Sequence, residues 1–149
     1  MIDKWTHHKT CRISPEAPVP IIKLTQLYDE LGGAGNALRH LSNLSTTSHE
    51  LITVIGDDSA GLDLIRLGEK GKDRIHWVTD KSRKTTIKER LYLDDELKFR
   101  LDSEDLFEIS EEIEAILISK IDEVIDGFDV ILLSDYAKRG FYPEILLRK

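Results

Sequence analysis

The sequence has one cysteine, no long hydrophobic run and fewer basic than acidic residues. Cys11 has no partner in the chain, which excludes an internal disulfide and favours a reducing compartment. No segment is apolar for long enough to cross a membrane, and the N-terminal residues lack the hydrophobic stretch of a signal peptide. We therefore expect a cytoplasmic protein with no membrane partner. The formal net charge of −7 argues against a nucleic-acid partner, because no basic field would attract a phosphate backbone.

Short apolar runs alternate with helical patterns along the 149 residues, which is typical of parallel βαβ units and predicts a single α/β domain. We expect strands at residues 51–55, 74–79, 84–93, 97–101 and 128–133, and helices at 34–44, from 59, at 110–126 and from 143. The apolar run 128–133 predicts a strand that is covered on both faces. Residues 1–12 show little periodicity, so the pair His7-His8 is expected in a solvated loop. That pair lacks ligand spacing and predicts no metal site.

The stretch of residues 31–36 contains a glycine pair at the entrance of the first expected helix. Backbone N–H groups at such an entrance can bind an anion or a row of hydroxyls. Gly32 and Gly33 add room, because no side chain blocks a ligand's approach to the main chain. The alternative is an ordinary tight loop before a core helix.

Polar clusters follow two expected strands, where ligands bind in open α/β sheets. Asp57 and Asp58 follow one strand, and residues 134–138 follow another. Lys88 and Arg90 place positive charge on one face of a third strand, with the geometry to hold a phosphate. Carboxylates for hydroxyls and cations for phosphate would suit a phosphorylated sugar. The alternatives are a solvated strand face for the cations and helix or turn caps for the polar loops.

Six segments of the chain also resemble, in matching order, motifs of the ribokinase (PfkB) carbohydrate kinases. They are Arg-Ile-Ser-Pro-Glu-Ala-Pro-Val-Pro at 12–20, Gly-Gly-Ala-x-Asn at 32–36, Gly-x-Asp-x-x-Gly at 56–61, Thr-Thr-x-Lys-x-Arg at 85–90, Arg-Leu-Asp at 100–102 and Leu-Ser-Asp-Tyr-x-Lys in the turn 133–140. The first is similar to the lid segment of bacterial heptose 7-phosphate kinases.

The resemblance implies the N-terminal portion of a ribokinase-like three-layer α/β/α sandwich over residues 1–149. A small β-strand lid is expected at about 12–27 and 74–102. The implied activity is ATP- and Mg²⁺-dependent phosphorylation of C1 of heptose 7-phosphate, in ADP-heptose synthesis for surface glycans such as lipopolysaccharide. By the same resemblance, the residues that would hold sugar hydroxyls are Asp3, Gly32, Gly33 and Asn36. Those expected at the phosphate end and pocket rim are Lys88, Arg90, Asp135 and Lys138.

Two parts of the family pattern are missing from the sequence. The resemblance lacks the first core strand, so Asp3 is equally well explained as a frayed terminus. It also lacks the second half, with the ATP-binding loops and the Gly-Ala-Gly-Asp motif that carries the catalytic base, so no catalytic residue is expected here. Two hypotheses follow: a separate chain supplies the second half, or the chain is an inactive truncated product that associates with itself through the lid, as a homodimer.

Overall fold

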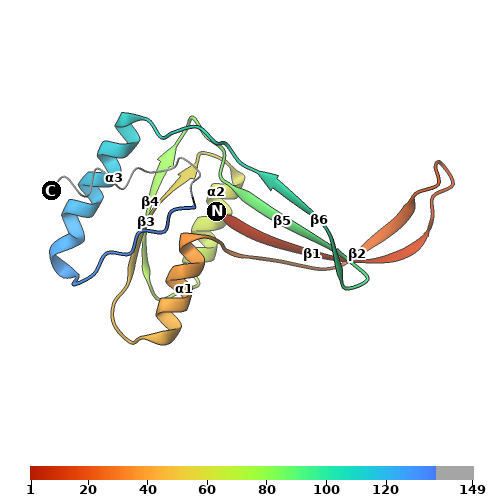
Figure 1. Ribbon diagram of the computed structural model, residues 1–149, viewed down its shortest axis with the longest axis horizontal. Coiled ribbons are helices and arrows are strands. Elements are labelled where there is room, and N and C mark those ends of the chain that lie inside the picture. The colour runs from red at the N-terminus through yellow and green to blue at the C-terminus, as the bar shows by residue number, and fades with distance from the viewer. Residues whose placement is uncertain (137–149) are drawn as a thin grey trace.

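A computed structural model describes residues 1–136 as two sheets with helices packed around one of them (Figure 1). In chain order the elements are β1 (Ile2–Ile13), β2 (Pro20–Leu31), α1 (Ala34–Leu44), β3 (Glu50–Gly56), α2 (Ser59–Gly68), β4 (Arg74–Asp80), β5 (Ile87–Leu93), β6 (Glu96–Ser103) and α3 (Glu111–Val124), with a 3₁₀ turn at Ile125–Gly127. The helix expected from residue 143 lies outside the described residues.

The smaller sheet pairs β3 with β4 in parallel and lies between helices. On one face Val78 of β4 packs with Ile113 and Leu117 of α3. On the other face Ile55 of β3 packs with Leu64 of α2. The predicted βαβ unit and the helix at 110–126 are thereby confirmed, and together they give a helix–sheet–helix arrangement of three layers.

Side-chain caps mark the starts of α2 and α3. Asp58 Oδ1 accepts the backbone N–H of Gly61 at 2.8 Å, and Ser110 Oγ accepts that of Ile113 at 3.3 Å. Each cap satisfies a donor that the first helical turn leaves unpaired.

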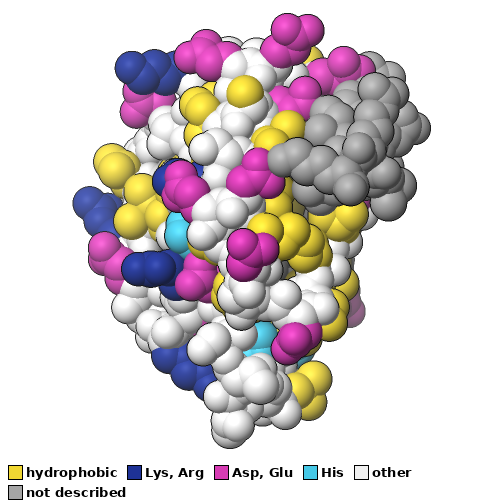
Figure 2. Space-filling view, turned by 90° about the vertical axis from the view of Figure 1, so that its left-hand side faces the viewer, with side chains coloured by type: hydrophobic (Ala, Val, Ile, Leu, Met, Phe, Trp, Pro, Cys, Tyr) yellow, Lys and Arg dark blue, Asp and Glu magenta, His cyan; other side chains and the backbone are white. Residues whose placement is uncertain are grey.

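Figure 2 looks onto the α3 side of the molecule, where acidic side chains are spread among hydrophobic ones.

The larger sheet has four strands in the order β2-β1-β5-β6, and we call it the lid sheet. β1 pairs antiparallel with β2 and parallel with β5. β6 pairs antiparallel with β5, which agrees with the strands expected at 84–93 and 97–101. The lid segments proposed at about 12–27 and 74–102 remain a prediction. The structure places β4 in the smaller sheet with β3, so the 74–80 part of the second segment is not in the lid sheet.

The solvated loop expected at residues 1–12 is wrong, because these residues form the long inner strand β1. Backbone hydrogen bonds to β2 and β5 order this strand on both sides. Ile2 is 1% exposed and anchors the strand in the core beside Leu64. The alternative of a frayed terminus at Asp3 is overturned by the same pairing.

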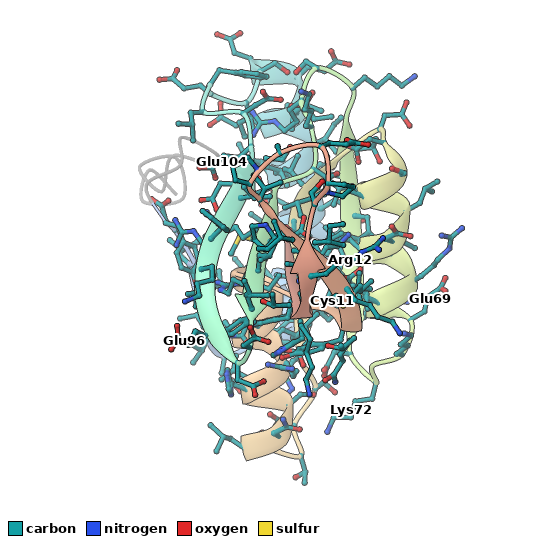
Figure 3. The ribbon with its side chains drawn as sticks, turned by 90° about the vertical axis from the view of Figure 1, so that its right-hand side faces the viewer. Cys11, Arg12, Glu69, Lys72, Glu96 and Glu104 are labelled. Carbon is teal, nitrogen blue, oxygen red and sulfur yellow. The ribbon has the colours of Figure 1, made fainter. Side chains whose placement is uncertain are left out.

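β1 and β2 extend past the other strands as a two-stranded arm (Figure 1). Pairing of β1 with β5 ends at His8, whereas its pairing with β2 continues to Ile13. Figure 3, viewed toward the arm, shows Cys11 and Arg12 on it, with Glu96 on one side and Glu69 and Lys72 on the other. The proline-rich residues 14–19 form the turn at its tip, and β2 begins at Pro20.

The buried strand expected at 128–133 is also wrong. The segment has no strand partner within residues 1–136, and Val130 is 80% exposed. An apolar run becomes a covered strand only when neighbouring strands supply hydrogen bonds and helices supply cover. The described part of the chain supplies neither to this segment.

Candidate functional site

The centre of the candidate site is the contact between Asp3 on β1 and the glycine pair before α1. A Cβ atom built on Gly32 would lie 2.5 Å from Asp3 Oδ2 and 2.8 Å from its Cγ, which is closer than real contacts allow. The Gly32 N–H donates to the Met1 carbonyl at 2.9 Å, so the loop is bonded to the start of β1. Only a residue without a side chain lets this carboxylate approach the main chain so closely.

Gly33 occupies the position immediately before α1 in a left-handed conformation, with φ of 57°. Residues that have a side chain rarely adopt a positive φ, so glycine is needed for the backbone to enter the helix there. No side chain caps α1, whose N-terminal turn therefore keeps backbone donors for another acceptor. A Cβ on Gly33 would lie 3.6 Å from the Tyr136 ring, which places the 134–136 segment beside the same loop.

Arg90 on β5 completes this group through an ion pair. Its Nη1 donates to Asp3 Oδ1 at 2.7 Å, and both side chains are mostly buried. The guanidinium lies over the Trp5 ring, with Cζ 5.1 Å from the ring centroid. The carboxylate is thus held by one oxygen, while its second oxygen lies against Gly32.

Lys88, the other predicted cation, is also paired within the chain. Its Nζ donates to Asp102 Oδ2 at 2.7 Å and lies 3.6 Å from Glu104 Oε2. Arg100 holds the same Asp102 at 2.9 Å. The hydrogen bond from Lys88 has the largest effect on the pKa of Asp102 and, together with Arg100, lowers that pKa against the opposing effect of desolvation. A phosphate at Lys88 would have to compete with these carboxylates.

The remaining predicted residues lie at different distances from this centre. Asn36 is on α1, one turn from the glycine pair, where its Oδ1 accepts a hydrogen bond from Arg39 at 2.9 Å. Asp135 is exposed and directly precedes Tyr136, which contacts the Gly33 side of the site. Lys138 lies outside the described residues. The structure therefore brings together Asp3, Gly32, Gly33 and Arg90.

The polar cluster at the end of β3 has a structural role. Asp58 Oδ2 accepts the Thr85 N–H, and Thr85 Oγ1 accepts the Gly56 N–H, each at 2.8 Å. Burial alone would raise the pKa of Asp58, but the hydrogen bonds from Thr85 and Gly61 reverse this effect and lower it. These bonds join the smaller sheet to the strand that carries Lys88 and Arg90. A hollow of about 360 Å³ lies beside them, between β3 and α2.

Sequence reasoning missed Trp5, because it treated residues 1–12 as a loop. The signal was a period of two: Asp3, Trp5 and His7 alternate along the strand and share a face. Within residues 1–136 no cluster of three or more His, Cys, Asp or Glu side chains could hold a metal ion. In the same range no helix has the length and apolarity to span a membrane.

The sequence matches no protein-family profile. It is 36% identical to the bifunctional protein HldE of Paramagnetospirillum magneticum over 93% of this chain, and 39% identical to HldE of Campylobacter jejuni over 97%. The chain spans less than a third of the length of these curated relatives, 28% and 30% respectively. These relatives confirm the family resemblance that was expected from the six motifs.

Solved structures of carbohydrate kinases share the fold. Phosphofructokinase-2 from Escherichia coli, in complex with fructose 6-phosphate, superposes with a TM-score of 0.54 at 17% identity, covering 82% of this chain and 39% of that one. Ribokinase from Giardia lamblia gives 0.57 at 9% identity, covering 80% and 38%. The predicted ribokinase-like α/β fold is thereby confirmed.

Proposed function

We propose that this chain is the N-terminal, sugar-binding part of an ATP-dependent carbohydrate kinase that phosphorylates C1 of heptose 7-phosphate in the cytoplasm. The product would serve ADP-heptose synthesis for surface glycans such as lipopolysaccharide. The observation that carries the proposal is the Asp3 carboxylate held against a glycine loop at the start of α1. The similarity to HldE proteins and to carbohydrate kinase structures supports it.

The site can bind a polyol without further groups. Asp3 accepts hydrogen bonds from sugar hydroxyls, and backbone N–H groups at the α1 entrance donate to sugar oxygens. We assign the same role to Gly32, Gly33 and Asn36. Lys88 would meet the phosphate end by exchanging a carboxylate partner for the phosphate. Arg90 would donate to the phosphate through guanidinium N–H groups other than the one that Asp3 accepts, with Asp135 and Lys138 at the rim.

Phosphoryl transfer needs groups that the 149 residues do not include. ATP, with Mg²⁺ to neutralise charge on the transferred phosphate, and the catalytic base would come from a region resembling the second half of the family. That region would be a further segment or a separate chain. The role of the present residues is to hold the sugar so that its C1 hydroxyl faces this region.

Calorimetric titration of the chain with heptose 7-phosphate tests the binding step. Asp3→Asn is expected to weaken binding roughly 10- to 100-fold, because one charge-assisted hydrogen bond contributes about 1.5–3 kcal/mol. Asp126→Asn, an exposed carboxylate on the 3₁₀ turn, serves as the matched control. Equal affinity of the two variants would contradict the assignment of Asp3.

The transfer step is tested by mixing the chain with a polypeptide carrying the second half, ATP, Mg²⁺ and heptose 7-phosphate. We expect ADP release that requires all components, together with a new phosphate on C1 detectable by ³¹P NMR. No sugar-dependent ADP release from a mixture that forms a complex would refute the proposed reaction.

We also propose that two copies associate through the lid sheet. Leu27, Phe99 and Leu101 share the face opposite Asp3 and are 52%, 64% and 56% exposed. Several exposed apolar side chains on one face of a sheet are typical of an interface. Leu101→Glu is expected to convert a dimer to a monomer in light scattering. Leu62→Glu, on the exposed side of α2, should not; a monomeric unsubstituted chain would refute the dimer.

A further inference from the structure

Four aromatic rings form a continuous stack on the face of the lid sheet that carries Asp3. Trp5 stacks on Tyr28 with ring centroids 5.1 Å apart and an interplanar angle of 12°. His7 lies between Tyr28 and Tyr92, with centroid distances of 6.0 and 4.8 Å. The stack therefore crosses three strands, with members from β2, β1 and β5.

Strand register determines the order of this stack. Trp5 of β1 is directly opposite Tyr28 of β2 and Arg90 of β5, so these side chains stand on the same face. Asp3 is two residues before Trp5 and shares that face. The Arg90 guanidinium covers the side of the indole that Tyr28 leaves open, and it ends the stack beside Asp3.

Sugar rings often stack on an aromatic face, but Trp5 has no free face for one. Tyr28 occupies one side of the indole and Arg90 the other. The indole instead restricts the plane of the guanidinium, which prefers to lie parallel to an aromatic ring. A guanidinium held in this plane directs one N–H at Asp3 Oδ1.

We propose that Trp5 is a positioning residue for the sugar site, acting through Arg90 on Asp3. Trp5 orients the Arg90 guanidinium, and Arg90 holds one carboxylate oxygen of Asp3. The second oxygen, Oδ2, then faces the Gly32 loop, where it accepts a sugar hydroxyl. The last step rests on the proposed sugar-binding function, whereas the effect of Trp5 on Arg90 does not.

The effect on Arg90 is measured by NMR of the unliganded chain. An indole 5.1 Å from Cζ shifts the Arg90 side-chain resonances upfield by its ring current. Trp5→Leu is expected to abolish this shift, and Trp5→Phe to retain part of it. Phe107→Leu removes an aromatic ring that lies on Arg83 instead of Arg90 and is the matched control, so its Arg90 resonances should not move.

The effect on binding is measured by titration with heptose 7-phosphate. We expect Trp5→Leu to weaken binding roughly 5- to 30-fold, which is the range of a partly desolvated cation–π contact. Trp5→Phe should restore most of the affinity, and Phe107→Leu should retain all of it. Unchanged Arg90 resonances and affinity in Trp5→Leu would overturn the proposal.

Arg90→Lys provides a second test if Trp5→Leu does not fold. It keeps the positive charge but lacks the planar group that stacks on the ring. We expect the Trp5 indole N–H resonance to move and the affinity to fall; no change in either would overturn the proposal. If the unsubstituted chain binds no heptose 7-phosphate, the proposed function fails, while the Arg90 resonances still decide whether Trp5 orients Arg90.

Discussion

Gly32→Ala is the sharpest test of the geometry around Asp3. The new Cβ would lie 2.5 Å from Asp3 Oδ2 and 2.8 Å from Cγ, about an ångström inside ordinary contact distances. Asp3 cannot rotate away without leaving Arg90 Nη1, to which it is bonded at 2.7 Å. We expect the free energy of unfolding to fall by about 1–3 kcal/mol, which is the usual cost of overpacking. Loss of one charge-assisted hydrogen bond has a similar cost.

Urea unfolding followed by tryptophan fluorescence measures this change. Gly127→Ala is the matched control, because a Cβ at that position meets nothing within 4 Å. It should leave stability unchanged or raise it by up to about 1 kcal/mol, through reduced freedom of the unfolded chain.

A double-mutant cycle with Asp3→Ala isolates the contact. When Asp3 is already truncated, Gly32→Ala meets no carboxylate and should cost little. If Gly32→Ala were as harmless as Gly127→Ala, or equally costly with and without the Asp3 carboxylate, the deduced packing would be refuted.

Three further outcomes test the rest of the fold. Thr85→Val removes the acceptor of the buried Gly56 N–H and should lower the free energy of unfolding in urea by about 1–3 kcal/mol. Thr85→Ser keeps this acceptor and should leave that free energy unchanged. Gly56→Ala should prevent stable folding, as judged by circular dichroism, because its Cβ would lie 2.4 Å from the backbone oxygen of Arg83. Burial alone would raise the pKa of Asp80, but hydrogen bonds from Ser82 and Arg83 lower it. This stabilisation is complete above the unfolded-state pKa of about 4 and is lost as the pH falls through the lowered folded value. Asp80→Asn should therefore flatten the acid dependence of the unfolding free energy, and an unchanged slope would contradict this assignment.

Local signals were sufficient for much of the fold. The glycine pair before an amphipathic run predicted the start of α1. Asp58 or Ser59 could be recognised as the cap of α2, of which the structure uses Asp58, and Ser110 could be recognised as the cap of α3. Each of these features depends on residues within one or two turns, where spacing and side-chain chemistry determine the structure.

Those local signals could not predict which strands and charges that are distant in the sequence pair with each other. β1 carries charged and aromatic residues instead of aliphatic ones on its Asp3 face, so it lacks the apolar period by which strands are recognised. Arg90 and Asp3 are separated by 87 residues, and nothing local showed that these charges neutralise each other. The run at 128–133 has the composition of a buried strand, but composition does not supply the neighbours that bury it.

The way β1 leaves the core has a mechanical consequence for the arm. Ile2 is fixed in the core and Asp3 follows it at once, so the base of the strand cannot move without disturbing the packing around α2. Pairing with β5 stops at His8, and both irregularities of the β1–β2 ladder, at His7/His8 and at Thr10/Arg12, lie at or beyond that point. Bending should therefore be confined to the part of the β1–β2 arm beyond β5, while the residues of β1 that pair with β5 stay in place. Asp94 of the β5–β6 turn still accepts the Thr10 N–H at 3.3 Å and its hydroxyl at 2.9 Å. Amide hydrogen exchange should therefore be fast beyond residue 10 and slow before residue 8.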